Sequence, residues 1–296
     1  MRRLALVALV AVPCGAAPVQ AQTLALAYKS GDTYKYALHS TVNQTMDAST
    51  MAVPVKIDVT AGETVTINSV DSSGTADVSI ALTKVVIKST TGLVNNTTSG
   101  MELPAITMKI ASDGRVVSTA VSGIVPDLIS PFSGGYGFIT AILPDAAVKP
   151  GDSWSKEFDQ ANRLGTGAIH VTAKSTYLRD ESVRGVNAAV VETKSTRSID
   201  ITIDTSKVIP KGVTDPSGSP QSTIPPGMFP SLSMKGTITS DTTSWVDPAS
   251  HRVLKTHRTA ITNTTMTYGG SSDPTVPGLT WPITIKGDET IDQNPA

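Results

Sequence analysis

The chain has 296 residues with 24 Lys+Arg against 25 Asp+Glu, a formal net charge of −1, and 17% charged, 39% hydrophobic and 4% aromatic residues. The near-neutral charge argues against a nucleic-acid partner, because phosphate binding needs a basic excess or a basic stripe. The length allows one or two domains with a proper hydrophobic core, and the regular apolar patterning excludes a disordered chain.

Residues 1–21 have the features of a secretory signal peptide. Arg2 and Arg3 form its positive end, residues 4–12 are apolar, and Val19-Gln20-Ala21 fits a small-residue cleavage site. The apolar run is shorter than the roughly 20 residues of a membrane-spanning helix, and no later stretch reaches that length. We therefore expect an exported protein without a transmembrane segment, located in the periplasm, outside the cell or at its surface.

Cys14 is the only cysteine and lies inside this leader. A lipoprotein would be acylated at such a cysteine, but Pro13 precedes it where a small residue is expected. We therefore expect cleavage after Ala21, which leaves a mature chain with no disulfide and no thiolate site.

Alternation of apolar and polar residues dominates the rest of the chain. It has a period of two in residues 53–60 and 198–204, in Ile106-Thr107-Met108-Lys109-Ile110, and in Trp281-Pro282-Ile283-Thr284-Ile285. This pattern is typical of antiparallel strands with one buried face and one wet face. Threonine occupies many of the polar positions, where a β-branched side chain suits an exposed strand surface.

Short turn sequences separate these runs and predict hairpin loops: Asp71-Ser72-Ser73-Gly74, Ser112-Asp113-Gly114 and Arg184-Gly185-Val186-Asn187. Such loops join strands that follow each other in the chain. We therefore predict an all-β protein, an antiparallel meander that forms a curved sheet or half-barrel.

Two segments depart from the strand pattern. Residues 124–144 are the most apolar stretch after the leader, and glycines interrupt them; they predict one or two short helices. Residues 210–230 are rich in proline, glycine and serine and predict a long exposed loop or arm.

Three landmarks recur in the same order and predict two related β units. Lys29-Ser30-Gly31-Asp32-Thr33-Tyr34 matches Lys149-Pro150-Gly151-Asp152-Ser153-Trp154, the turn at 71–76 matches that at 181–186, and residues 115–119 match 252–256. The units would span 22–140 and 141–296, with 210–230 as an insertion in the second. Chance similarity among β-hairpins is the alternative.

Three stretches carry a resemblance: YKSGDTYKYALHST, LPDAAVKPGDSWSKEF and WVDPASHRVLKTHRTAITNTTMTY. They resemble an uncharacterised family, a domain of unknown function, of exported bacterial β-rich proteins. The resemblance implies the fold and the compartment and no activity. In architecture, the expected fold is also similar to the half-barrel carriers of lipids and lipoproteins in bacterial envelopes.

A search for catalytic and metal-binding patterns nominates no residue as catalytic, metal-ligating or cofactor-binding. The four histidines, His39, His170, His251 and His257, form no metal-ligand spacing and suit solvated strand positions. Asp71 and its neighbouring serines suit a turn cap better than a metal site. Acidic residues fall mostly in turns or at outward strand positions, so nothing singles out a glycosidase pair.

The leading hypothesis is a non-enzymatic exported protein that binds an apolar, lipid-like small molecule or an envelope protein. The ligand would lie under the 124–144 segment, because concave apolar surfaces are preferred ligand sites. An ordinary core is the alternative for the candidate lining residues, which are Leu128, Ile129, Phe132, Phe138, Ile142, Met228 and Phe229. Two further functions stay open: a cell-surface structural or interaction module, and a hydrolase without a recognisable motif. The sequence does not fix the oligomeric state.

Overall fold

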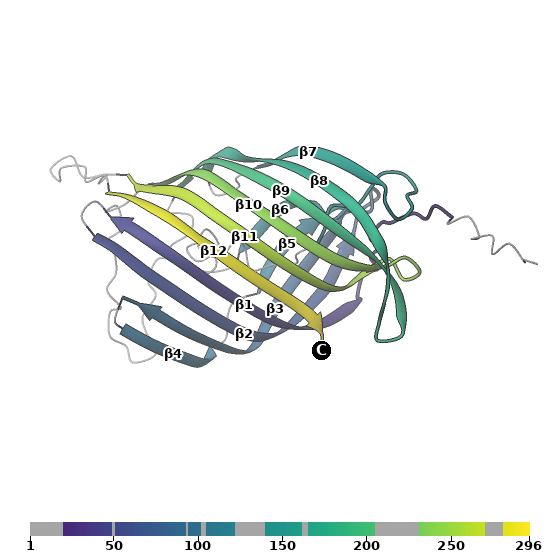
Figure 1. Cartoon of the computed structure of the whole chain (residues 1–296), viewed down its shortest axis with the longest axis horizontal. Helices are drawn as coiled ribbons and strands as arrows, with labels where there is room; N and C mark the ends of the chain where they lie inside the picture. Colours follow the sequence, from purple (N-terminus) through teal and green to yellow (C-terminus); the bar gives the residue numbers. More distant parts are fainter. Residues whose placement is uncertain are drawn as a thin grey trace, which may run out of the picture.

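The fold is a single, strongly curved antiparallel sheet (Figure 1). It is seen in a computed structural model, which describes residues 20–48, 51–92, 94–101, 105–121, 140–161, 165–204, 231–269 and 281–296. No helix occurs among these residues, so none of them forms a helix long and apolar enough to cross a membrane. The predicted all-β, antiparallel fold is confirmed.

The sheet has 12 strands in the order β6-β5-β3-β2-β1-β12-β11-β10-β9-β8-β7, with β4 paired to β3 beside this path. The strands are β1 (Thr33–Ala48), β2 (Met51–Val70), β3 (Ala76–Thr91), β4 (Val94–Met101), β5 (Ile106–Ile110), β6 (Val116–Val121), β7 (Ser153–Ala161), β8 (Gly165–Val183), β9 (Val186–Asp204), β10 (Ser231–Asp247), β11 (Arg252–Tyr268) and β12 (Trp281–Pro295).

Two meanders join through the first and last strands, β1 and β12, which pair along most of their lengths. The sheet then wraps around until its end strands β6 and β7 approach each other without forming a ladder (Figure 1). The result is a nearly closed half-barrel with an inner and an outer face.

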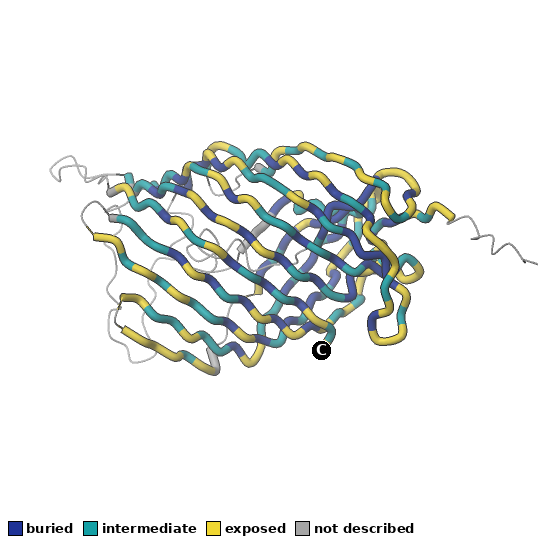
Figure 2. The backbone as a smooth tube through the Cα atoms, viewed as in Figure 1, coloured by how far each residue is buried: buried dark blue, intermediate teal, exposed yellow. Residues whose placement is uncertain are grey.

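Buried residues alternate with more exposed ones along the strands (Figure 2). Along β1, Tyr36, Leu38, Ser40 and Val42 are buried, and the residues between them are exposed or half-buried. This is the period of two that the sequence predicts, because successive side chains of a strand point to opposite faces.

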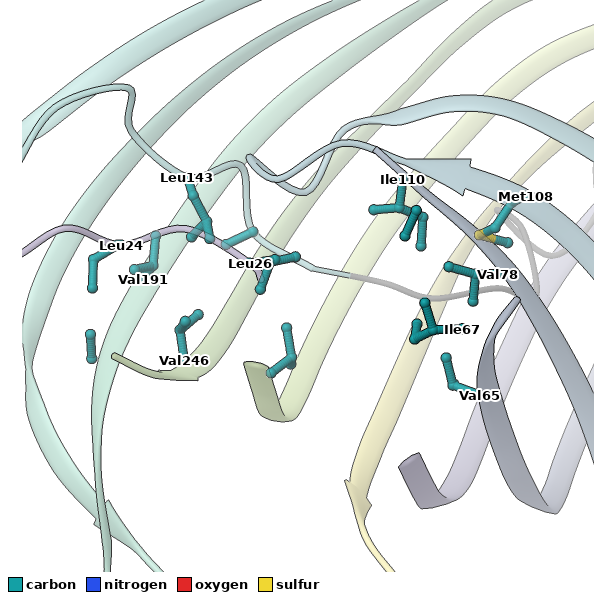
Figure 3. Close-up of a cluster of buried hydrophobic side chains, with 14 of the residues drawn as sticks. Leu24, Leu26, Val65, Ile67, Val78, Met108, Ile110, Leu143, Val191 and Val246 are labelled. Carbon is teal, nitrogen blue, oxygen red and sulfur yellow. The ribbon is translucent and has the colours of Figure 1, made fainter. Parts of the chain in front are cut away.

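The largest apolar cluster fills one end of the interior (Figure 3). Strand residues such as Ile67, Val78 and Val191 meet three residues from outside the strands, Leu24, Leu26 and Leu143, which are at most 2% exposed. A backbone bridge between Gln22 and Val148 ties the two irregular segments together. This end of the half-barrel is therefore closed by a packed core.

The predicted short helices near 124–144 are not seen. Residues 122–139 lie outside the described residues, and residues 140–144 are irregular. A helix would need their amide groups for its own hydrogen bonds, but Ala141 N–H donates to Ser244 Oγ at 2.8 Å and Ile142 N–H to Thr193 Oγ1 at 2.9 Å. The segment is thus held by the sheet. The whole of the predicted 210–230 arm lies outside the described residues.

The two Gly-Asp turns ahead of β1 and β7 have the same geometry. Gly31 N–H donates to Ile67 O at 2.8 Å, and Gly151 N–H donates to Tyr177 O at 2.7 Å. Both glycines have a positive φ, 90° and 95°. The turn therefore repeats in structure as it does in sequence, while the division into two related units at 22–140 and 141–296 remains a prediction within one continuous sheet.

Candidate functional site

Of the seven predicted lining residues, only Ile142 lies among the described residues. It is buried, its N–H donates to Thr193, and its carbonyl accepts a bond of 3.0 Å from Trp154 Nε1. Ile142 thus belongs to a segment docked on the inner face. The other six, Leu128, Ile129, Phe132, Phe138, Met228 and Phe229, lie outside the described residues.

Buried polar side chains, among them Thr193, Ser244 and Thr256, form a belt across the inner face of the sheet. The closed end described above lies on one side of this belt. A second apolar cluster, which we call the apolar wall, lies on the other side. The apolar wall consists of Ile199, Ile201, Ile203, Leu232, Met234, Ile238, Ala260, Met266 and Ile285. On the inner faces of β9 and β10, an apolar stretch, a polar stretch and a second apolar stretch therefore follow one another along the strand.

On strands β8 to β11 the belt has a structural role. Thr193 Oγ1 pairs with Ser175 Oγ at 2.8 Å and accepts from Ile142, while Ser244 accepts from Ala141 and pairs with Thr256. These hydroxyl groups satisfy buried amides of the docked segment, which would be costly to leave without partners.

On strands β1, β11 and β12 the belt forms a polar niche, which we define as Ser40, Arg258, Glu289 and Gln293. All four surround Ile291: Ser40 and Arg258 lie opposite it in the two strand registers, and Glu289 and Gln293 lie two positions away on β12. Neighbours of this kind lie about 4.5–7 Å apart on one face of a sheet. Each niche residue is at most 3% exposed.

The niche contains buried polar atoms that lack hydrogen-bond partners within the described part of the chain. They are Glu289 Oε1 and Oε2, Gln293 Oε1 and Ser40 Oγ. Buried polar groups are nearly always hydrogen-bonded, because desolvation without a partner costs free energy. The niche therefore departs from the saturated bonding of the same belt on β8 to β11.

Burial and charge perturb the ionisable groups of this region. Burial raises the pKa of Glu289 to about 7, against the opposing effect of Arg258 and Arg197. Burial lowers the pKa of Arg258, and it lowers the pKa of Arg197 to about 10 with a further contribution from Arg258. Two arginines and one carboxylate thus share a region of low polarity.

Glu63 on β2 adds a second carboxyl group to the inner face. Gln293 Nε2 donates to Glu63 Oε2 at 2.6 Å, which links Glu63 to the niche. Burial raises the pKa of Glu63 to about 7, although the bond from Gln293 acts in the opposite direction. With all groups ionised, the two glutamates balance the charges of Arg197 and Arg258.

Sequence reasoning missed these inward charges, since it expected acidic residues mostly in turns or at outward positions. The alternating pattern could have revealed Glu63, because this residue lies an even number of positions from Val59, Ala61 and Val65, which are all buried. Glu289 similarly lies an even number of positions from Ile285 and Ile291 on β12. A charged residue in register with buried apolar ones marks an inner-face position.

The histidines lie elsewhere. His39 pairs with Asp58 at 3.0 Å, His170 with Asp159 at 2.8 Å and His257 with Asp292 at 2.7 Å, and the three imidazoles are 44–51% exposed. These three pairs lie on the outer face, away from the polar niche. Within the described ranges, no group of three or more His, Cys, Asp or Glu side chains is placed to hold a metal ion.

Two open grooves cross the strands, with volumes of about 720 and 410 Å³. The first crosses β7 to β11 and includes Lys174 and Lys194; the second crosses β1 to β3 and β12 and includes Lys56 and Lys286. These four lysines are exposed on the outer face. No predicted lining residue lines either groove.

No known protein family matches the chain, and no curated protein matches it. The resemblance to an uncharacterised exported family therefore stays a prediction. Among solved structures, the chain is similar to a lipovitellin chain, from a structure concerned with lipid–protein interactions in lipovitellin, with 10% sequence identity and a TM-score of 0.39. The match covers 90% of this chain and 26% of that chain, so this chain spans about a quarter of that neighbour. A likeness at this level says nothing about a ligand.

Proposed function

We propose that the half-barrel binds an amphipathic, lipid-like molecule on its inner face. The observation that supports this is the contact between the apolar wall and the polar niche: Ala260, part of the wall, lies opposite Glu289 in the β11–β12 register. A surface with an apolar stretch and convergent polar groups at one end matches a molecule with a chain and a head group.

A purely structural core accounts less well for this arrangement. Burying ionisable groups costs free energy unless they are paired and hydrogen-bonded, and both oxygens of Glu289 lack such bonds within the described residues. An apolar side chain at this position would pack at lower cost. A buried Glu289 near two arginines therefore supports a role in binding.

The test is displacement of a fluorescent fatty-acyl probe from the purified chain, together with native mass spectrometry of protein isolated without detergent. We expect a one-to-one complex with the probe. Met234→Gln, which places a polar side chain of similar size in the apolar wall, should weaken probe binding by about tenfold.

Lys235→Gln is the matched control, because Lys235 is the next residue of β10 and is exposed. It should bind the probe like the unmodified chain. Absence of probe binding by the correctly folded unmodified chain, or equal binding by both variants, would overturn the proposal.

One observation favours the second candidate, an interaction module. Among the described strands, β4 pairs with β3 alone and so forms an edge. It carries neither lysine nor proline, the residues that usually protect an edge from further pairing. A partner would then add a strand to β4. Thr97→Lys should abolish any such complex, and a complex that tolerates this change would contradict pairing at β4.

A further inference from the structure

The chemistry of the polar niche indicates which kind of lipid head group the half-barrel would bind, and this inference rests on the proposed function. We propose that the polar niche selects an uncharged head group rich in hydroxyl groups, as in a monoacylglycerol or an alkyl glycoside. Its donors would meet the partnerless acceptors of Glu289 and Gln293.

The hydrogen-bonding inventory of the niche is the first argument. Of its atoms without partners in the described structure, three are carbonyl or carboxylate oxygens, on Glu289 and Gln293, and one is the hydroxyl of Ser40. Carbonyl and carboxylate oxygens accept hydrogen bonds, and the Glu289 carboxyl, whose pKa burial raises to about 7, also donates one while it is protonated. The complementary ligand must therefore donate hydrogen bonds and also be able to accept. An alcohol donates one hydrogen bond per hydroxyl and also accepts, which suits Ser40.

Charge is the second argument. Arg197 and Arg258 oppose Glu63 and Glu289 on the inner face, which leaves no net charge when all four are ionised. A carboxylate head group would face Glu289 at close range, and an ammonium head group would face the two arginines. Either would bring a like charge into a region where charges are poorly screened. A neutral polyol avoids both conflicts.

The position of the niche is the third argument. On β12 it lies between Ile285 of the apolar wall and the end of the strand, and its residues are at most 3% exposed. A head group there would leave water completely, so each of its donors needs a protein acceptor. A head group bound at a wet rim would not be selected in this way.

The experiment compares four oleyl probes that share one chain and differ in the head group: monoolein, methyl oleate, oleic acid and oleylamine. Each competes with the fluorescent acyl probe at neutral pH, below its aggregation concentration. We expect monoolein to displace the probe at about tenfold lower concentration than each of the other three.

Variants of the niche residues test whether the preference for monoolein arises in the polar niche. Glu289→Gln keeps the shape of the side chain and replaces one acceptor oxygen by a donor, so it should remove most of the preference for monoolein over methyl oleate. Asp288→Asn is the matched control on the exposed outer face and should keep it. Ser40→Ala, a smaller change in the same niche, tests the same expectation if Glu289→Gln does not fold.

The outcomes separate the two proposals. Binding of all four probes without preference, or a preference for oleic acid or oleylamine, overturns the head-group inference and leaves lipid binding intact. A monoolein preference that survives both niche variants places the head group elsewhere and also overturns it. Failure of all four probes overturns the proposed function itself.

Discussion

Glu63 shows what one inward carboxyl group does to stability. It is 3% exposed on β2 and accepts a hydrogen bond from Gln293. Burial raises the pKa of Glu63 from 4.5 to about 7, so between these pH values the folded chain keeps a proton that the unfolded chain has released. The stability linked to this group is complete below about pH 4.5 and is lost as the pH rises through about 7.

We therefore predict that Glu63→Gln raises the free energy of unfolding at pH 8 by about 1–3 kcal/mol and leaves it nearly unchanged at pH 4. The amide oxygen can still accept from Gln293, so the variant removes the charge and keeps the bond. Urea unfolding at both pH values measures the effect. Asp58→Asn on the outer face of the same strand is the control, and it should give no gain at pH 8, because His39 lowers the pKa of Asp58.

Among the elements, the segment at 140–144 depends on hydroxyl groups of the sheet. Thr193→Val keeps the side-chain shape and removes the acceptor for Ile142 N–H and the partner of Ser175. We expect a loss of about 1–3 kcal/mol in the free energy of unfolding, the cost of a buried amide without a partner. Thr172→Val, at an exposed position on β8, should change it by less than about 0.5 kcal/mol. Equal effects of the two changes would contradict this role of Thr193.

The repeated Gly-Asp turns make a paired prediction. Gly31 and Gly151 have φ values of 90° and 95°, and a Cβ atom at either would meet no other atom within 4 Å. The cost of alanine there is thus backbone strain alone, about 1–2 kcal/mol at each turn. Thermal or urea unfolding of Gly31→Ala and Gly151→Ala should show similar losses. A large loss at one turn and none at the other would show that the two turns differ in function.

The elements also show how far the sequence predicts this fold. Period-two runs and turn residues predict strands and hairpins, as at Asp71, whose carboxylate accepts from Ser73 and Thr75 N–H at 2.8 and 3.1 Å. The same local signals cannot show that β1 pairs with β12, because that pairing depends on inner-face packing between the chain's two ends. Part of the niche was missed for the same reason: Arg258 and Glu289 lie on the consecutive strands β11 and β12, but Ser40 joins them only through the pairing of β1 with β12.

For the whole molecule, the ionisable groups of the two faces together set the pH of greatest stability. On the inner face, burial raises the pKa of Glu63 and Glu289 to about 7, and both groups destabilise the fold as the pH rises from about 4.5 to 7. On the outer face, a hydrogen bond to Asp159 raises the pKa of His170, which acts in the same direction. At lower pH, carboxyl groups with a lowered pKa act in the opposite direction. Hydrogen bonds lower the pKa of Asp71, for example, and the stability that its carboxylate contributes is lost when it is protonated.

These directions predict a stability maximum on the acidic side, near pH 4.5, with lower free energy of unfolding at pH 7.5. Urea unfolding across this range measures the profile for the unmodified chain and for the double variant Glu63→Gln/Glu289→Gln. The double variant should flatten the decline between about pH 4.5 and 7, because the two raised pKa values then no longer exist. A maximum at neutral pH, or an unchanged slope in the double variant, would show that the two carboxyls titrate normally and that the inner face is more hydrated than its burial indicates.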